Sequence, residues 1–156
     1  PGGRLALEVR ADGPAIEATR GAILARGKDG LPLLVEQLKS VDKQMFQLAL
    51  GTAREFPGTE IDKALVEELS RATPDRAALV IQAMADRSDT VILSVVLKSA
   101  EAGPKPVRLS AINALARVGN ESCLNALLAT ALEDDADLAS AARTTLADLP
   151  GEKVNS

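Results

Sequence analysis

The stretch that decides the fold is Pro104–Asp134, which reads PKPVRLSAINALARVGNESCLNALLATALED. Apolar residues recur at spacings of three and four on both sides of a polar turn at Asn120. This spacing is typical of amphipathic helices, because it places the apolar side chains on one helical face. The stretch therefore predicts a helix, a tight turn and a second helix.

The same pattern recurs along the chain with a constant period of about 31 residues and no insertion, which is the signature of a repeat protein. One set of apolar positions in the second half of each repeat consists of Leu34, Leu65, Val96 and Leu127. A set in the first half consists of Ala18, Ala49, Val80, Ala111 and Ala142. Residues suited to turns separate the two helices at Gly27, Gly58, Asp89, Asn120 and Gly151, and separate the repeats at Asp42, Thr73, Pro104 and Asp135.

We therefore predict an all-α fold, an α-α superhelix (solenoid) of about four complete helical hairpins with partial units at both ends. The repeats lie at about 12–41, 42–72, 73–103 and 104–134, with a partial repeat at 135–156. We treat residues 1–156 as one domain. The chain opens Pro1-Gly2-Gly3 without a Met, so we expect it to be a segment of a longer protein.

The cleanest repeat resembles a known family. Its pattern is Val107-Arg108-x-x-Ala111-x-x-Ala114-Leu115-Ala116-x-x-Gly119, followed by Leu124-x-x-Leu127-Leu128-x-x-x-Leu132-x-Asp134. This pattern resembles the short HEAT repeat of the same period, also called the phycobilisome-lyase-like HEAT repeat. The resemblance implies a stack of hairpins whose second helices line a concave face. It implies little about function, since such arrays serve many unrelated roles.

The residue types exclude several kinds of chemistry. The chain has no His, Tyr or Trp, so catalysis by His is excluded and residues that hold or attach a tetrapyrrole are lacking. Asp134 and Asp135 are adjacent at a helix junction, where we interpret them as caps rather than as acid/base partners. The single Cys123 stands where earlier repeats have Ile61 and Ile92, so we predict a buried structural side chain. We expect no enzyme activity, no cofactor and no metal site.

Charge and hydropathy bound the partners. Eighteen basic and 22 acidic residues give a net charge of −4, and only two aromatic residues are present. Nucleic-acid binders need a cationic face, and single-strand binders add aromatic platforms, so we expect no nucleic-acid partner. The longest apolar run, Ala77–Ile81, is far shorter than the roughly 20 residues of a membrane span.

The prediction for function is a protein–protein interaction or scaffold module that binds its partner on the concave face. The polar residues predicted to lie on that face, pointing away from the core, are Glu36, Gln37, Glu67, Glu68, Arg71, Lys98, Ser99 and Thr130. One alternative is an architectural spacer between domains of a larger bacterial protein. A further alternative is an accessory subunit or domain of a lyase-like enzyme.

Overall fold

The computed structural model describes residues 13–149, and within them every regular element is a helix. This part of the chain contains nine α-helices and two short 3-10 helices, which confirms the predicted all-α class. The chain divides into two compact units, Pro1–Ala64 and Leu65–Ser156. The turn predicted at Gly151 lies outside the described residues.

Unit 1 consists of two layers of short helices and the start of the next helix. Its elements are α2 (Gly13–Ala25), η1 (Gly27–Gly30), α3 (Leu31–Leu38), α4 (Lys43–Glu55) and the first residues of α5 (Glu60–Arg71), which crosses the boundary between the units. Helix α4 packs against both α2 and α3. It therefore forms the centre of this unit.

Glycines permit the tight connection between α2 and α3. Gly27 has a φ of 57°, in the left-handed region that side chains disfavour. Gly30 lies so close to α2 that a Cβ atom there would be 2.4 Å from the carbonyl oxygen of Ile23. Both positions therefore require the absence of a side chain.

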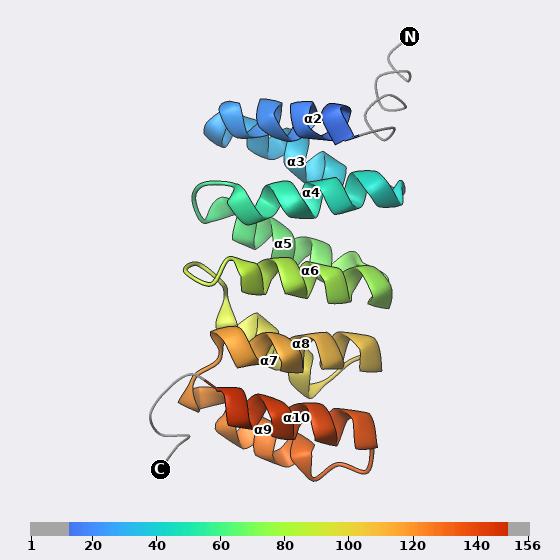
Figure 1. The fold of residues 1–156 in the computed structure, drawn as a ribbon, viewed down its shortest axis with the longest axis vertical. Coiled ribbons are helices and arrows are strands. Elements are labelled where there is room, and N and C mark those ends of the chain that lie inside the picture. Colours follow the sequence, from blue (N-terminus) through green and yellow to red (C-terminus); the bar gives the residue numbers. More distant parts are fainter. Residues whose placement is uncertain (1–12, 150–156) are drawn as a thin grey trace. The chain divides into compact units, whose positions relative to one another are not determined.

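Unit 2 is a longer stack of the same kind. Its remaining elements are α6 (Pro74–Asp86), α7 (Leu93–Glu101), α8 (Lys105–Val118), η2 (Glu121–Cys123), α9 (Leu124–Ala131) and α10 (Ala136–Asp148). Helix α8 packs between α6 and α10, as Figure 1 shows. Helix α7 packs against α8, and α9 packs against α10 and contacts α7. The first helices of the hairpins thus form one layer, and α7 and α9 form the other.

The helix starts follow the predicted period. Helices α4, α6, α8 and α10 begin at positions 43, 74, 105 and 136, which are equally spaced along the chain. Their N-caps are the predicted boundary residues Asp42, Thr73, Pro104 and Asp135. Asp135 accepts hydrogen bonds from the amides of Asp137 and Leu138, as expected of a cap. Its neighbour Asp134, also predicted as a cap, is exposed beyond the end of α9.

The predicted core positions are buried. In the second helices, Leu34, Leu65, Val96 and Leu127 are at most 1% exposed. In the first helices, Ala49, Val80, Ala111 and Ala142 are fully buried. Cys123 is a free thiol with no exposed surface, which confirms the prediction of a buried structural side chain. The largest buried side chain, Phe46 on α4, anchors unit 1.

Candidate binding site

The residues predicted for partner binding lie on four helices and in both units. Helix α3 carries Glu36 and Gln37, α5 carries Glu67, Glu68 and Arg71, α7 carries Lys98 and Ser99, and α9 carries Thr130. Glu36, Glu67, Arg71 and Lys98 are exposed. The structure brings Glu68 together with Arg71 in an ion pair. It also places α7, which carries Lys98 and Ser99, in contact with α9, which carries Thr130. It does not join all eight residues into one described surface.

Two of the eight face inward rather than toward solvent. Thr130 is 4% exposed, and its hydroxyl donates a hydrogen bond of 2.8 Å to the carbonyl of Ala126. A threonine on a helix can satisfy its hydroxyl in this way and remain buried. Glu68 is 6% exposed and accepts a hydrogen bond of 2.9 Å from Arg71, which compensates its charge. The sequence analysis predicted a solvent-facing position for both residues because it used their polar residue type and could not show how their polar groups are satisfied.

Charged side chains in unit 2 connect neighbouring helices, both between hairpins and within one hairpin. Lys105 at the start of α8 lies 2.8 Å from a carboxylate oxygen of Asp137 and 3.0 Å from one of Asp135. Arg108 donates two hydrogen bonds, of 3.0 and 2.7 Å, to the carboxylate of Glu133. Arg108 also donates one of 2.8 Å to the carbonyl of Ala100.

These pairs shift the pKa values of their members. Hydrogen bonds to Asp137 and Asp135 raise the pKa of Lys105, since both favour the charged ammonium. The hydrogen bond from Arg108 lowers the pKa of Glu133. Two hydrogen bonds lower the pKa of Asp135: the larger effect comes from the backbone amide of Leu138 and the next from the side chain of Lys105. In this part of unit 2, the charges therefore hold α8 to α10 through Lys105 and to the end of α9 through Arg108.

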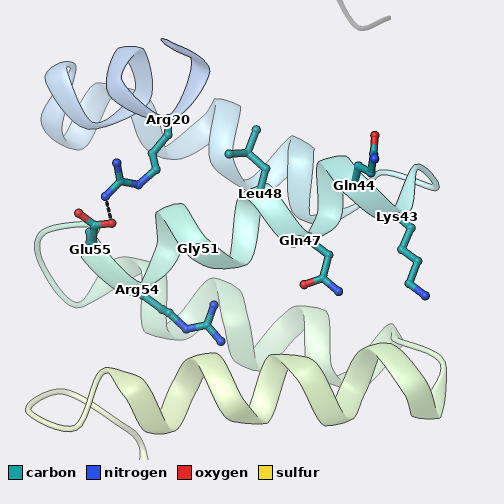
Figure 2. Close-up of a pocket in the computed structure, with 8 residues that line it drawn as sticks. All are labelled: Arg20, Lys43, Gln44, Gln47, Leu48, Gly51, Arg54 and Glu55. Atoms are coloured by element: carbon teal, nitrogen blue, oxygen red, sulfur yellow. Dashed lines mark hydrogen bonds and ion pairs between the residues drawn. The ribbon is translucent and has the colours of Figure 1, made fainter. Parts of the chain in front are cut away.

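Unit 1 carries an open groove on the face of α4, next to α2. Its volume is about 860 Å³. The residues that line it are Arg20 from α2 and Lys43, Gln44, Gln47, Leu48, Gly51, Arg54 and Glu55 from α4. Figure 2 shows Arg20 reaching across from α2 to form an ion pair with Glu55 at the end of α4. Lys43 lies at the opposite end of the groove (Figure 2).

Gly51 forms part of the floor of this groove. It lies inside α4, and a Cβ atom added there would have no other atom within 4 Å. At the same register α6 has Gln82 and α8 has Asn113. Gln82 donates a hydrogen bond of 3.2 Å to the hydroxyl of Ser110 on α8, so in unit 2 a side chain fills this position. The missing side chain at Gly51 therefore leaves space in the groove.

The two ends of the groove differ in their charge environment. Lys43 is the first residue of α4, and the first turn of this helix contains no acidic side chain. Among residues 13–149 the structure pairs no side chain with Lys43, whereas Lys105 at the same register of α8 is bound by two aspartates. The carboxylate of Asp42, the N-cap of α4, accepts from the amide of Met45 at this end, so the group that attracts an anion here is Lys43.

The sequence contained a signal for this groove. A glycine inside a helix weakens it by roughly 0.5–1 kcal/mol relative to alanine, and Gly51 is the glycine of this register. The sequence prediction placed the binding face on the second helices instead, because the resemblance to HEAT repeats implied that face. The alignment of Gly51 with Gln82 and Asn113 is what points to the first helices.

The groove provides amides, cations, one carboxylate and a small apolar floor. In residues 13–149 no three His, Cys, Asp or Glu side chains group so that they could hold a metal ion. No helix in the described residues has the length and apolar character needed to cross a membrane. Comparison with models of known protein families gives no match, and comparison with curated proteins gives no match either.

Proposed function

We propose that the protein is a non-catalytic binding module for a protein partner, and that the groove on α4 is its contact site. The observation that carries this proposal is the open groove of about 860 Å³, lined by eight residues of two packed helices. A volume of this size is in the range of known ligand sites and accommodates several side chains of a partner. Positions on helices are held more rigidly than positions on loops, which favours specific binding.

We also propose that the hairpins of both units belong to one HEAT-like superhelical array. This is supported by first helices that start at equal intervals along the chain, and by core positions that repeat at the same interval. A compact chain of this length would have a radius of gyration of about 15 Å. Small-angle X-ray scattering should therefore give a clearly larger radius of gyration, and the value of a compact chain would contradict the array.

Site-specific photo-cross-linking in the source cell tests the binding function. A photoreactive amino acid would replace Gln47 in the groove or, in a second variant, Lys98 on α7. We expect protein adducts from position 47 and few from position 98, with the adducts identified by mass spectrometry. Adducts from position 98 alone would move the contact site to the second helices. The absence of adducts from both positions would contradict the binding function.

An architectural spacer in a larger bacterial protein is the second candidate. It is favoured by the ion pairs of unit 2, because Lys105 and Arg117 pair with acidic residues of a neighbouring hairpin. Such pairs resist separation of the hairpins and leave less charge for a partner. Under this alternative, cross-linking yields no adducts, and filling the groove has no consequence for the function of the whole protein.

A further inference from the structure

We infer that the groove on α4 binds an extended, acidic peptide segment of the partner, with a carboxylate of that segment at Lys43. This inference rests on the proposed function and adds the chemistry of the ligand. It is carried by the juxtaposition of a lysine at the start of α4 that pairs with no side chain of residues 13–149, two glutamine amides along this helix, and the empty position at Gly51.

The charge of the groove selects an anion. Three of its eight lining residues are cations, namely Arg20, Lys43 and Arg54, and one, Glu55, is a carboxylate. Arg20 is engaged by Glu55, whereas Lys43 follows Asp42, whose carboxylate caps α4 by accepting from the amide of Met45. A carboxylate of the ligand gains a charge-assisted hydrogen bond from Lys43. The chain as a whole has a net charge of −4, so the groove is a local exception.

The remaining groups suit a main chain that lies along the helix. Gln44 and Gln47 lie one and four residues after Lys43, and their amides can both donate to a peptide carbonyl and accept from a peptide N–H. From Lys43 to Arg54 the helix rises about 16 Å, which an extended peptide covers with about five residues. Leu48 and the open position at Gly51 leave room on the floor for one small side chain.

These features favour a peptide over a nucleic acid. A strand of nucleic acid presents a phosphate at every nucleotide and needs a row of cations, and single-strand sites add aromatic side chains on which bases stack. None of the eight lining residues is aromatic, and the cations lie only at the two ends. Figure 2 shows the glutamines and Gly51 between these ends.

The test is selection of peptides from a random 12-residue phage library on the whole immobilised chain. We expect enriched sequences with two or more Asp or Glu residues. The affinity of a synthetic enriched peptide would then be measured by fluorescence anisotropy for the wild type and three variants. Gly51→Gln fills the floor with the side chain that α6 has at this register. Lys43→Glu reverses the charge at the end of the groove. Lys98→Glu makes the same change in net charge on exposed α7 and is the matched control.

We expect Gly51→Gln and Lys43→Glu each to weaken binding by about tenfold or more, and Lys98→Glu to change it less than twofold. Gly51→Gln should fold normally, because nothing lies within 4 Å of its Cβ position and glutamine favours helices over glycine. Thermal denaturation would verify that each variant is folded. A second substitution at the same site, Gly51→Ala, should retain most of the affinity because it adds only one methyl group.

The outcomes separate this inference from the proposed function. Enriched peptides that are not acidic, or whose binding survives both groove variants, would overturn the acidic ligand and leave a binding module intact. Loss of binding in Lys98→Glu alone would place the site on the second helices. Absence of any enriched peptide would contradict the binding function together with the inference. Tight binding of a 12-nucleotide single-stranded RNA, lost in Lys43→Glu, would replace the peptide with a nucleic acid.

Discussion

The helix pair α2–α4 in unit 1 and the pair α6–α8 in unit 2 occupy the same register of the repeat, yet they use it differently. Between α6 and α8, Gln82 bonds to Ser110 and Arg117 pairs with Asp86, so polar side chains bridge the two helices. On α4 the positions equivalent to Ser110 and Asn113 hold Leu48 and Gly51, so the bond between Gln82 and Ser110 has no counterpart there. Arg20 and Glu55 pair across the two helices instead, and an open groove lies beside this pair.

This difference shows how a repeat protein can separate structure from function. Every hairpin must bury the same apolar positions, so those positions vary little in character along the chain. The outward positions of the first helices are under no such constraint. In unit 2 they include Lys105, which pairs with a neighbouring hairpin, whereas in unit 1 Arg20 pairs with Glu55, and Lys43 and Gly51 line an open groove.

The largest expected effect is at the position that Phe46 and Arg108 share in α4 and α8. Phe46 is fully buried, so Phe46→Ala should lower the free energy of unfolding by about 3–5 kcal/mol, through lost burial and the cavity left behind. Urea denaturation would measure it. Ala77 holds the equivalent position in α6, so Ala77→Gly serves as a smaller matched change. A loss below about 1 kcal/mol for Phe46→Ala would show that unit 1 has no anchored core.

Arg108 occupies in α8 the position that Phe46 occupies in α4, and its substitution should lower the free energy of unfolding less. Arg108→Ala removes the hydrogen bond to the carbonyl of Ala100 and the paired bonds to Glu133, and should cost about 1–2 kcal/mol. Arg108→Lys should recover only part of this, because lysine cannot form the paired geometry. Equal stability of the alanine and wild-type proteins would contradict a clamping role for Arg108.

Substitutions of the N-cap residues should change stability by an intermediate amount. Asp42 accepts a hydrogen bond of 3.1 Å from the amide of Met45, and Asp42→Ala should therefore lower stability by about 1 kcal/mol. Thr73, the N-cap of α6, makes no such side-chain bond, so Thr73→Ala should cost less. Urea denaturation of both variants would decide the matter. The reverse order would indicate that the caps act through some other contact.

Gly51→Ala should increase stability by about 0.5–1 kcal/mol. Alanine favours the helix over glycine, and the added methyl group would have no other atom within 4 Å. Thermal denaturation would show a higher midpoint. A lower midpoint would mean that the added methyl group collides with a neighbouring atom and that the floor of the groove at Gly51 is not open. Gly30→Ala is the opposite case, because its Cβ would collide with the carbonyl of Ile23, and it should be clearly destabilising.

The smallest expected effect is a pH dependence of unit 2. Glu133 and Asp135 have folded pKa values below their ordinary values, so their stabilising contribution is complete above the ordinary carboxyl range. It is lost as the pH falls through the lowered folded values, below about 4. Thermal denaturation midpoints would be measured between pH 3 and 6 for the wild type and for the double variant Glu133→Gln/Asp135→Asn. At the acid end of this range, the midpoint of the double variant should fall less than that of the wild type. An identical decline in this variant and the wild type would assign the acid sensitivity to other groups.

The period of the sequence was sufficient to predict the helices and their inward faces. Repeated apolar positions such as Leu34 and Leu127 are buried because a helix must place its apolar stripe against a neighbour. The caps at Asp42 and Asp135 were equally predictable, since a cap acts on the next few residues of its own chain. These features depend on local geometry, which one repeat contains in full.

Residue type could not predict which polar side chains face solvent or a partner. Thr130 and Glu68 are polar residues, yet both are buried. The hydroxyl of Thr130 donates to the carbonyl of Ala126, and the carboxylate of Glu68 accepts from Arg71. The ion pair from Lys105 depends on a neighbouring hairpin, as does the pair formed by Arg20 with Glu55, and the pair from Arg108 depends on the second helix of its own hairpin.

By itself, the sequence determined that the chain is helical, where its helices begin, and that Cys123 is a core residue. Only the tertiary structure decided that Lys105 is neutralised while Lys43 lines an open groove, although both begin a first helix of the repeat. The physical reason is that a helix and its cap are local, whereas a charge pair or a groove requires two helices to approach. The groove at Gly51 becomes visible only once α2 and α4 are packed together.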